Sequence, residues 1–182
     1  MAEKVIERHP EPEPKELIFE WMQEYYRVRR EGMGKGQVVI RDKDTGWEQN
    51  RQGLIKFYTH PKIWPELAVP GWAIFKHYIK TQSGRHTHQG GLGLFVVEGR
   101  GYTVVDGTRY DWEKGDFIVL PVKPEGCEHQ HFNLDPAHPA EWLALIFWPF
   151  FDAMGNLKKQ SEETSPDWSG PTPPAPKVPH AF

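Results

Sequence analysis

Between residues 72 and 148 the chain alternates short apolar segments with Gly, Pro and Asp turns, and this pattern constrains the fold more than any other feature. Asp106-Gly107 separates two of the segments, and this dipeptide is a strong signal for a two-residue β-hairpin turn. Short strands at such close intervals predict a sandwich or barrel rather than an alternating α/β fold. The segments expected to form strands are 38–40, 54–58, 72–80, 94–97, 102–105, 108–112, 117–120 and 142–148.

The segments on either side of this all-β region have a different composition. Residues 1–13 are charged and interrupted by prolines, which predicts a loose N-terminal arm. Apolar residues then recur at helical spacing, and we expect an amphipathic helix between Pro14 and Gly32. The end of the chain is proline-rich and predicts an extended tail. The expected organisation is an N-terminal arm and helix at 1–35, a barrel at 36–160 and a Pro-rich C-terminal tail at 161–182.

Composition excludes several classes of protein. The chain has 182 residues, a formal net charge of -3 and no dense block of Lys and Arg, which argues against a nucleic-acid partner. No apolar run approaches the roughly 20 residues of a membrane span, so we expect no membrane. The N-terminus has no apolar signal-peptide core, and the single cysteine, Cys127, cannot form an internal disulfide. We therefore expect a cytoplasmic protein.

Two histidine pairs carry most of the chemical information. His86 and His88 are two residues apart in a segment expected to be extended, so both imidazoles point to the same side. His129 and His131 have the same spacing further along. A His-x-His pair by itself also occurs on surface strands by chance. The order of features is more specific, because the first pair is followed by an apolar strand ending in Glu-Gly-x-Gly, a Gly-Asp turn, a proline-ended strand and a late His-x-x-x-Asn.

This order resembles the two conserved motifs of the cupin superfamily. The resemblance covers roughly residues 72–148. It implies an all-β fold, the cupin double-stranded β-helix or jelly-roll barrel, with one divalent metal at its mouth. It also carries the role of metal ligand to His86, His88 and His129. The other positions that match the motifs are Gly99, Gly115, Pro121, Gly126 and Asn133.

One departure from the family pattern bears on mechanism. Leu92, or Gly93 with the longer spacing, stands where many cupins place a glutamate ligand. Three neutral imidazoles leave a divalent iron with its full charge and about three open positions, which suits an anionic substrate beside dioxygen. The two motifs look most like those of gentisate-type dioxygenases, which usually carry two cupin domains. The resemblance therefore implies a single-domain three-His relative of those enzymes.

The function expected from these residues is that of a mononuclear non-haem Fe(II) dioxygenase. It would cleave a small oxygenated aromatic or enolisable carbonyl substrate, with that small molecule and O2 as its partners. Zn, Mn or Ni can also occupy such a site. Two alternatives stay open: a non-oxidative metal-dependent lyase or isomerase of the cupin type, and a non-catalytic cupin that binds a small ligand. The family also implies a homodimer or homotetramer.

Two further histidines are candidates for the surroundings of the metal. His131 either acts beside the ligands, on substrate or on a ligand, or is a satisfied structural histidine. His77 lies in phase with Ala73, Phe75 and Ile79 on an expected strand, so its side chain is expected to point inward. It either lines the pocket or has a buried structural role.

Three polar residues are candidates for binding substrate. Arg85 could pair with the carboxylate of an anionic substrate, although a surface arginine is the plainer alternative. Gln89 faces away from the His pair by strand alternation, unless Gly90-Gly91 bends the chain. Tyr102 is a candidate for substrate binding or for acid–base chemistry.

Overall fold

The computed structural model describes residues 17–61, 67–155 and 157–171. The chain divides into two compact units, one containing Met1–Val38 and Glu66–Val69 and the other containing Val39–Pro65 and Pro70–Phe182. The arm expected at 1–13, and the part of the expected tail after residue 171, lie outside the described residues. Across the described part of the chain, no helix is long and apolar enough to cross a membrane.

The first unit contains one long helix, α1 (Ile18–Lys35), none of whose residues is buried. Its polar side is held by ion pairs of Arg27 with Glu24 and Glu31, each at 2.6 Å. The expected end at Gly32 is wrong, because the helix continues to Lys35 before Gly36 leaves the helical conformation. One glycine inside a helix costs only about 1 kcal/mol, which does not by itself end it. The aromatic and aliphatic residues of α1 are Ile18, Phe19, Trp21, Met22, Tyr25, Tyr26, Val28 and Met33.

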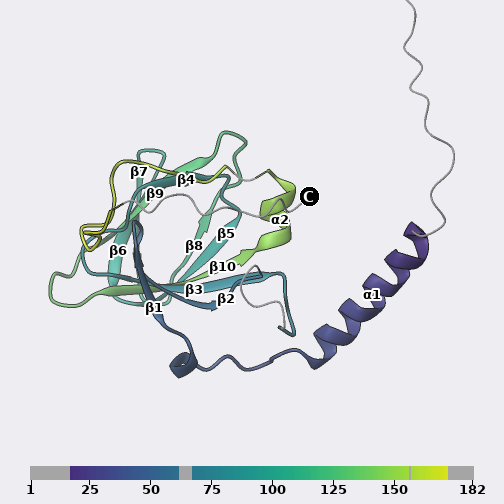
Figure 1. The fold of residues 1–182 in the computed structure, drawn as a ribbon. Helices are drawn as coiled ribbons and strands as arrows, with labels where there is room; N and C mark the ends of the chain where they lie inside the picture. The colour runs from purple at the N-terminus through teal and green to yellow at the C-terminus, as the bar shows by residue number, and fades with distance from the viewer. Residues whose placement is uncertain (1–16, 62–66, 156, 172–182) are drawn as a thin grey trace, which may run out of the picture. The chain divides into compact units, whose positions relative to one another are not determined.

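The second unit is a barrel of two antiparallel sheets (Figure 1). One sheet has the strand order β1-β2-β3-β10-β5-β8 and the other has the order β11-β4-β9-β6-β7. The strands of the first sheet are β1 (Trp47–Asn50), β2 (Gly53–Thr59), β3 (Trp72–Ile79), β5 (Leu92–Glu98), β8 (Phe117–Leu120) and β10 (Ala140–Phe147). Those of the second are β4 (His86–His88), β6 (Arg100–Val105), β7 (Thr108–Glu113), β9 (Cys127–Asn133) and β11 (Lys159–Gln160). The jelly-roll expectation is confirmed by this arrangement.

Local turn chemistry explains the hairpin between β6 and β7. Asp106 and Gly107 have φ angles of 47° and 81°, and Val105 pairs with Thr108 across the turn. Two central residues with positive φ form the turn that matches the twist of the flanking strands. The predicted two-residue hairpin is therefore confirmed.

The core lies between the inner faces of the two sheets. Alternate residues of each strand point inward, so the buried apolar side chains occur at every second position. The main cluster of buried residues is Ala73, Ile79, Leu92, Leu94, Val105, Leu120, Cys127, Trp142, Ala144, Ile146 and Phe151. His77, Thr103, His129 and His131 are also buried among the described residues of the barrel. The interior therefore has an apolar end and a polar, histidine-rich part.

Some expected elements differ from the structure. The strand predicted at 38–40 is wrong, because these residues lie in no strand and Val38 is 82% exposed. A short run of β-branched residues favours extended backbone, but it forms a strand only with a partner. Two short elements were not foreseen: the single helical turn η1 (Asp42–Asp44) and the helix α2 (Trp148–Ala153) after the last long strand. The polar strands β1 and β11 were also missed.

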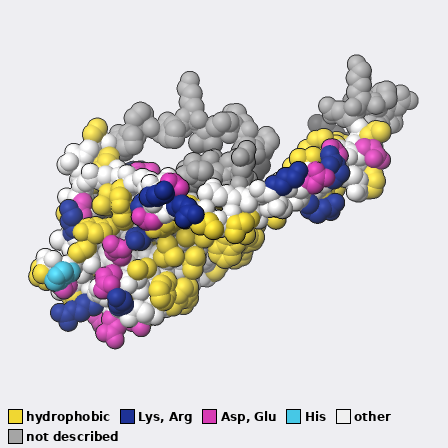
Figure 2. Space-filling model, turned by 90° about the horizontal axis from the view of Figure 1, so that it is seen from below, with side chains coloured by type: hydrophobic (Ala, Val, Ile, Leu, Met, Phe, Trp, Pro, Cys, Tyr) yellow, Lys and Arg dark blue, Asp and Glu magenta, His cyan; other side chains and the backbone are white. Residues whose placement is uncertain are grey.

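The outer face of the six-stranded sheet is unusually apolar. Antiparallel sheets commonly place polar residues on the solvent side, but here the outward positions of β5, β8 and β10 are mostly apolar. Phe95, Phe117 and Val119 are 41%, 53% and 70% exposed. The charged side chains on this face are paired, Lys76 with Glu141 at 3.1 Å and Lys56 with Asp42 at 2.9 Å. Figure 2 shows hydrophobic side chains gathered on this side of the barrel.

Candidate metal centre

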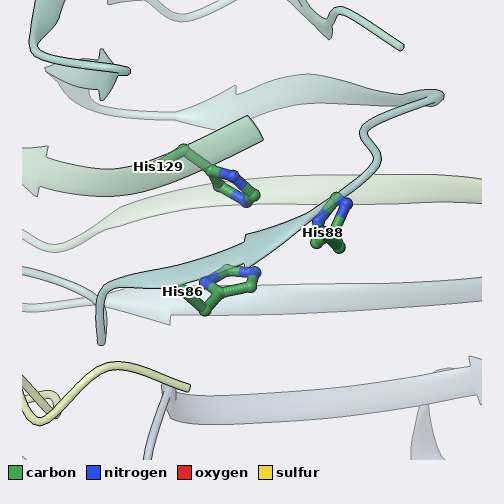
Figure 3. A group of neighbouring side chains, drawn as sticks. All are labelled: His86, His88 and His129. Carbon is green, nitrogen blue, oxygen red and sulfur yellow. The ribbon is translucent and has the colours of Figure 1, made fainter. Parts of the chain in front are cut away.

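Two neighbouring strands, β4 and β9, bring three histidines together. β4 pairs with β9 so that His86 lies opposite His129, and His88 follows two residues later on the same face. Cross-strand partners project to the same side, so all three imidazoles point into the barrel. Figure 3 shows them turned toward one common point. Each offers a ring nitrogen within 4.8 Å of the other two.

This donor set fits a divalent metal ion. Two nitrogens bound to one ion at about 2.1 Å lie at most about 4.2 Å apart, so small side-chain rotations reach ligating distance. Burial lowers the pKa of His88 to about 3 and that of His129 to about 4, and it holds the pKa of His86 well below its usual range. All three rings are therefore neutral at pH 7, and neutral imidazole is the form that binds metal.

Hydrogen bonds orient the three rings differently. Nδ1 of His129 donates to the carbonyl of Cys127 at 2.9 Å, which leaves its Nε2 free to accept a metal. The backbone N–H of Gly90 donates to Nδ1 of His88 at 3.0 Å, so neutral His88 carries its ring proton on Nε2. To ligate a metal through Nε2 as a neutral ring, His88 has to carry that proton on Nδ1 instead and give up the bond from Gly90. Nδ1 of His86 is buried and has no hydrogen-bond partner among the described residues. This nitrogen could therefore bind a ligand or a solvent molecule.

The ligand set differs from the four-ligand pattern of many cupins. Among the described residues, the group that could hold a metal contains His86, His88 and His129 and no carboxylate. Leu92, at the glutamate position, is 9% exposed and packs in the apolar core. A metal bound here would keep its full positive charge.

His131 and His77 are both placed inside the barrel. The His131 ring centroid is 5.6 Å from that of His129, and its Nδ1 is 2.8 Å from Oγ1 of Thr103. The same Thr103 oxygen accepts a hydrogen bond from Nε1 of Trp112 at 2.9 Å. The rings continue inward from His131 to Trp142, at 5.0 Å, and from Trp142 to His77, at 4.8 Å. His131 therefore adjoins the candidate ligands, whereas His77 is one ring further away.

Burial keeps these two inner histidines neutral. Loss of solvation lowers the pKa of His77 to about 3 and holds that of His131 well below its usual range. Nε2 of His77 and Nε1 of Trp142 have no hydrogen-bond partner among the described residues. The inner part of the barrel therefore contains polar atoms that the protein alone does not satisfy. Whether His131 and His77 act on substrate stays a prediction.

Two of the three candidate substrate residues, Arg85 and Tyr102, lie away from the histidine group. Arg85 forms an ion pair with Glu163 at 2.5 Å, on the outer side of the sheet that carries the histidines. Tyr102 stacks on Phe132 with ring centroids 4.6 Å apart, on the face opposite to that of the inward residue Thr103. Neither side chain joins the three-His group.

Gln89 is buried and holds two loops together. The chain bends directly after it, with φ angles of 80° and 71° at Gly90 and Gly91. Its Oε1 accepts from the backbone N–H of Leu157 at 2.6 Å, and its Nε2 donates to the carbonyl of Pro124 at 3.4 Å. Its amide is thus engaged by backbone on both sides. Gln89 fastens the segment after α2 to the histidine loop.

Sequence reasoning missed two groups near the histidines. Phe151 of α2 packs against His88, with ring centroids 5.4 Å apart. The positive charge of Lys158 acts on His86, His88 and His129, whose pKa values it lowers. Both residues follow the last long strand, in a segment that has no strand alternation or motif to single them out.

Comparisons with known proteins agree with this architecture. Residues 78–146 match the sequence profile of the Cupin domain family. The chain is 28% identical over 110 residues to a 5-aminosalicylate 1,2-dioxygenase of Comamonas sp., an alignment that covers 60% of this chain and 28% of the relative. The chain thus spans little more than a quarter of the length of that curated relative.

Solved structures show the same fold. The salicylate 1,2-dioxygenase of Pseudoaminobacter salicylatoxidans, in its adduct with gentisate, matches with a TM-score of 0.50 at 21% identity, over 82% of this chain and 38% of that one. The Streptomyces protein PAC13, solved with uridine, matches with a TM-score of 0.50 at 10% identity, over 71% of this chain and 94% of that one. These matches agree with the jelly-roll arrangement of the two sheets, within which residues 78–146 resemble the Cupin domain family.

Proposed function

We propose that the chain is a mononuclear non-haem Fe(II) dioxygenase that cleaves a small oxygenated aromatic or enolisable carbonyl substrate. The observation that carries the proposal is the group of three neutral histidines, two buried and one half-buried, which contains no carboxylate among the described residues. The similarity to a 5-aminosalicylate 1,2-dioxygenase supports an aromatic substrate. The chain covers 28% of the length of that relative, and we propose the same type of activity for this chain.

In this proposal the residues of the site have three roles: holding the metal, excluding water and hydrogen-bonding to substrate. His86, His88 and His129 would hold Fe(II), and the ion would supply open positions for substrate oxygens and for O2. The ring of Phe151 packs against His88, and the ring of Trp142 packs against His131. Both rings would restrict the access of water to the metal ligands. His131, held at Nδ1 by Thr103, directs its remaining ring edge into the interior and stays neutral. It can therefore exchange a hydrogen bond with a bound substrate without adding charge.

Metal content and oxygen uptake test this proposal together. Protein purified without added metal should contain about one iron per chain, and Fe(II)-loaded protein should consume O2 with a substrate from the hydroxybenzoate, catechol, hydroquinone or diketone class. His88→Ala should lose both the metal and the uptake. The matched control is His138→Ala, because the His138 side chain is 79% exposed and pairs only with Asp135. It should retain both.

Two results would speak against the dioxygenase. Stoichiometric zinc or nickel without O2 uptake would favour the metal-dependent lyase or isomerase. A protein that takes up no metal after reconstitution would contradict the metal centre itself.

We also propose that two copies of the chain associate through the outer face of the six-stranded sheet. Such a sheet is about 29 Å wide and its longest strands are about 26 Å long, which gives roughly 750 Å². This is close to the roughly 800 Å² that each partner buries in an interface of standard size. The charges of Lys76 and Glu141 are already paired, so a face that meets a second copy of itself carries no like-charge penalty.

Mass measurement tests this association. Phe95→Lys places a charge in the centre of the apolar face, and Leu134→Lys, at an exposed residue outside the strands, is the matched control. Light scattering should give twice 21.1 kDa for the wild type and for Leu134→Lys, and 21.1 kDa for Phe95→Lys. A dimeric Phe95→Lys would rule out this face. A Trp21→Glu variant that alone becomes monomeric would assign the contact to α1 instead.

A further inference from the structure

The segment after α2 returns to the edge of the strand that carries two of the histidines. β11 pairs with β4 so that Gln160 lies opposite His86 and Lys159 lies opposite Thr87. Paired residues project to the same side and successive residues alternate. Lys159 therefore points outward with Thr87, and the preceding residue, Lys158, falls on the inner side with His88.

Contacts on both sides fix the backbone around Lys158. The N–H of Leu157 donates to Oε1 of Gln89 at 2.6 Å, and the N–H of Ser161 donates to the carbonyl of Arg85 at 3.1 Å. The ladder between β11 and β4 lies between these two bonds. The backbone of Lys158 is therefore fixed beside the strand that carries His86 and His88.

Among the described residues, Lys158 has no acidic partner, whereas four other lysines of the barrel have one. Ion pairs join Lys56 to Asp42, Lys76 to Glu141, Lys114 to Glu98 and Lys123 to Asp106. Within the residues that the structure describes, no carboxylate lies within ion-pair distance of Lys158. Its charge is thus available to a ligand.

The loss of solvation at the ammonium agrees with an end that is turned toward the protein. The residue is exposed, yet loss of solvation lowers the pKa of its amine. Both hold for a group whose stem reaches the surface and whose end is turned toward the protein. Its positive charge also lowers the pKa of His86, His88 and His129, so it is close to all three.

The geometry points to Lys158 as the residue that binds the carboxylate of a small aromatic acid at the mouth of the three-His site. Arg85, the cation that the sequence suggested, is engaged by Glu163 on the outer side of the sheet. Among the described residues, no acidic side chain joins the three histidines. Anions are therefore favoured here with or without a metal ion. This inference deepens the function proposed above and rests on it for the aromatic nature of the ligand.

Calorimetry with Zn(II)-loaded full-length protein tests the inference without requiring any oxidation. Salicylate and its uncharged analogue salicylamide have nearly the same shape and differ in the carboxylate. Wild type should bind salicylate at least about tenfold more tightly than salicylamide. A tenfold difference in affinity is the lower end of the range for a hydrogen bond between charged groups. Lys158→Met should lose about ten- to hundredfold in affinity for salicylate. Its affinity for salicylamide should not change.

Two variants serve as controls. Lys158→Arg keeps the charge and should retain most of the salicylate affinity. Lys159→Met removes the neighbouring lysine, which points away from the site, and should behave as wild type. Equal zinc content and melting temperature in all variants would show that each is folded and loaded.

The opposite outcomes overturn the inference. Salicylate affinity that is unchanged in Lys158→Met, or that falls equally in Lys159→Met, excludes a specific role for Lys158. Wild type that does not bind salicylate at about 10 mM excludes the carboxylate site. Failure of the dioxygenase would look different, since iron-loaded protein would then consume no O2 while the zinc-loaded protein still bound salicylate through Lys158.

Discussion

Replacing Thr103 by Val should destabilise the barrel by removing one hydroxyl. Thr103 is fully buried, and its Oγ1 accepts from Nε1 of Trp112 at 2.9 Å and bonds to Nδ1 of His131 at 2.8 Å. Valine has nearly the same shape, so the cavity term is small and the lost hydrogen bonds dominate. Both partner atoms become buried and unsatisfied, because Trp112 is 5% exposed and His131 is 2% exposed.

The size of the effect follows from those two atoms. Each unsatisfied buried group costs about 1–3 kcal/mol, so Thr103→Val should lose about 2–6 kcal/mol of the free energy of unfolding. For a chain of this length that corresponds to a fall in Tm of roughly 4–24 °C. Thr103→Ser keeps the hydroxyl and loses one methyl group, which costs about 1 kcal/mol.

Urea unfolding of the three proteins, without metal, checks this reasoning. Thr103→Val should be clearly less stable than Thr103→Ser, although valine fills the site better. If serine proves the worse substitution, packing and not hydrogen bonding governs this position. The account of how His131 is held beside the candidate ligands would then be wrong.

Two further predictions concern the same barrel. Because burial lowers the pKa of His77 to about 3 from an ordinary 6.5, the stability that neutral His77 contributes is complete above pH 6.5 and is lost as the pH falls toward 3. In metal-free urea titrations, His77→Phe should therefore gain on wild type by about 1.4 kcal/mol per pH unit below pH 6.5, and parallel profiles would contradict this. Gly90→Ala should cost well over 2 kcal/mol, because its Cβ would lie 1.9 Å from the carbonyl of Pro121 at a φ of +80°. Gly107→Ala, with a φ of +81° and open space around the added Cβ, should cost only about 1–2 kcal/mol. Equal melting temperatures for the two variants would show that the close approach of Gly90 to Pro121 does not matter.

Local signals in the sequence predicted most of the barrel. Alternation of apolar residues and the turn residues Asp106-Gly107 depend on neighbours in the chain, so they can be read without a partner strand. The strands β3, β5, β6, β7, β8 and β10 were therefore expected close to their observed bounds. The segment 38–40 shows the limit of such prediction, because its β-branched residues favour extended backbone but belong to no strand of the described structure.

The site was predictable only in part. The shared face of His86 and His88 follows from strand alternation, whereas His129 joined them through a resemblance to cupin motifs. The placement of His129 opposite His86 is a matter of register between distant strands. Lys158 and Phe151 could not be found at all, since they reach the site through α2 and the return of the chain along β4. No local feature of the sequence around Arg85 indicates that it pairs with Glu163.

The position of β4 has a consequence for the order of assembly. This strand has three residues, too few to persist alone, and it is hydrogen-bonded by β9 on one side and β11 on the other. Both partners come much later in the chain, so closing these loops is a late and slow step. During synthesis the N-terminal residues emerge first. His86 and His88 therefore leave the ribosome before the strands that fix them, and the group of three histidines forms in its final arrangement only once β11 is available.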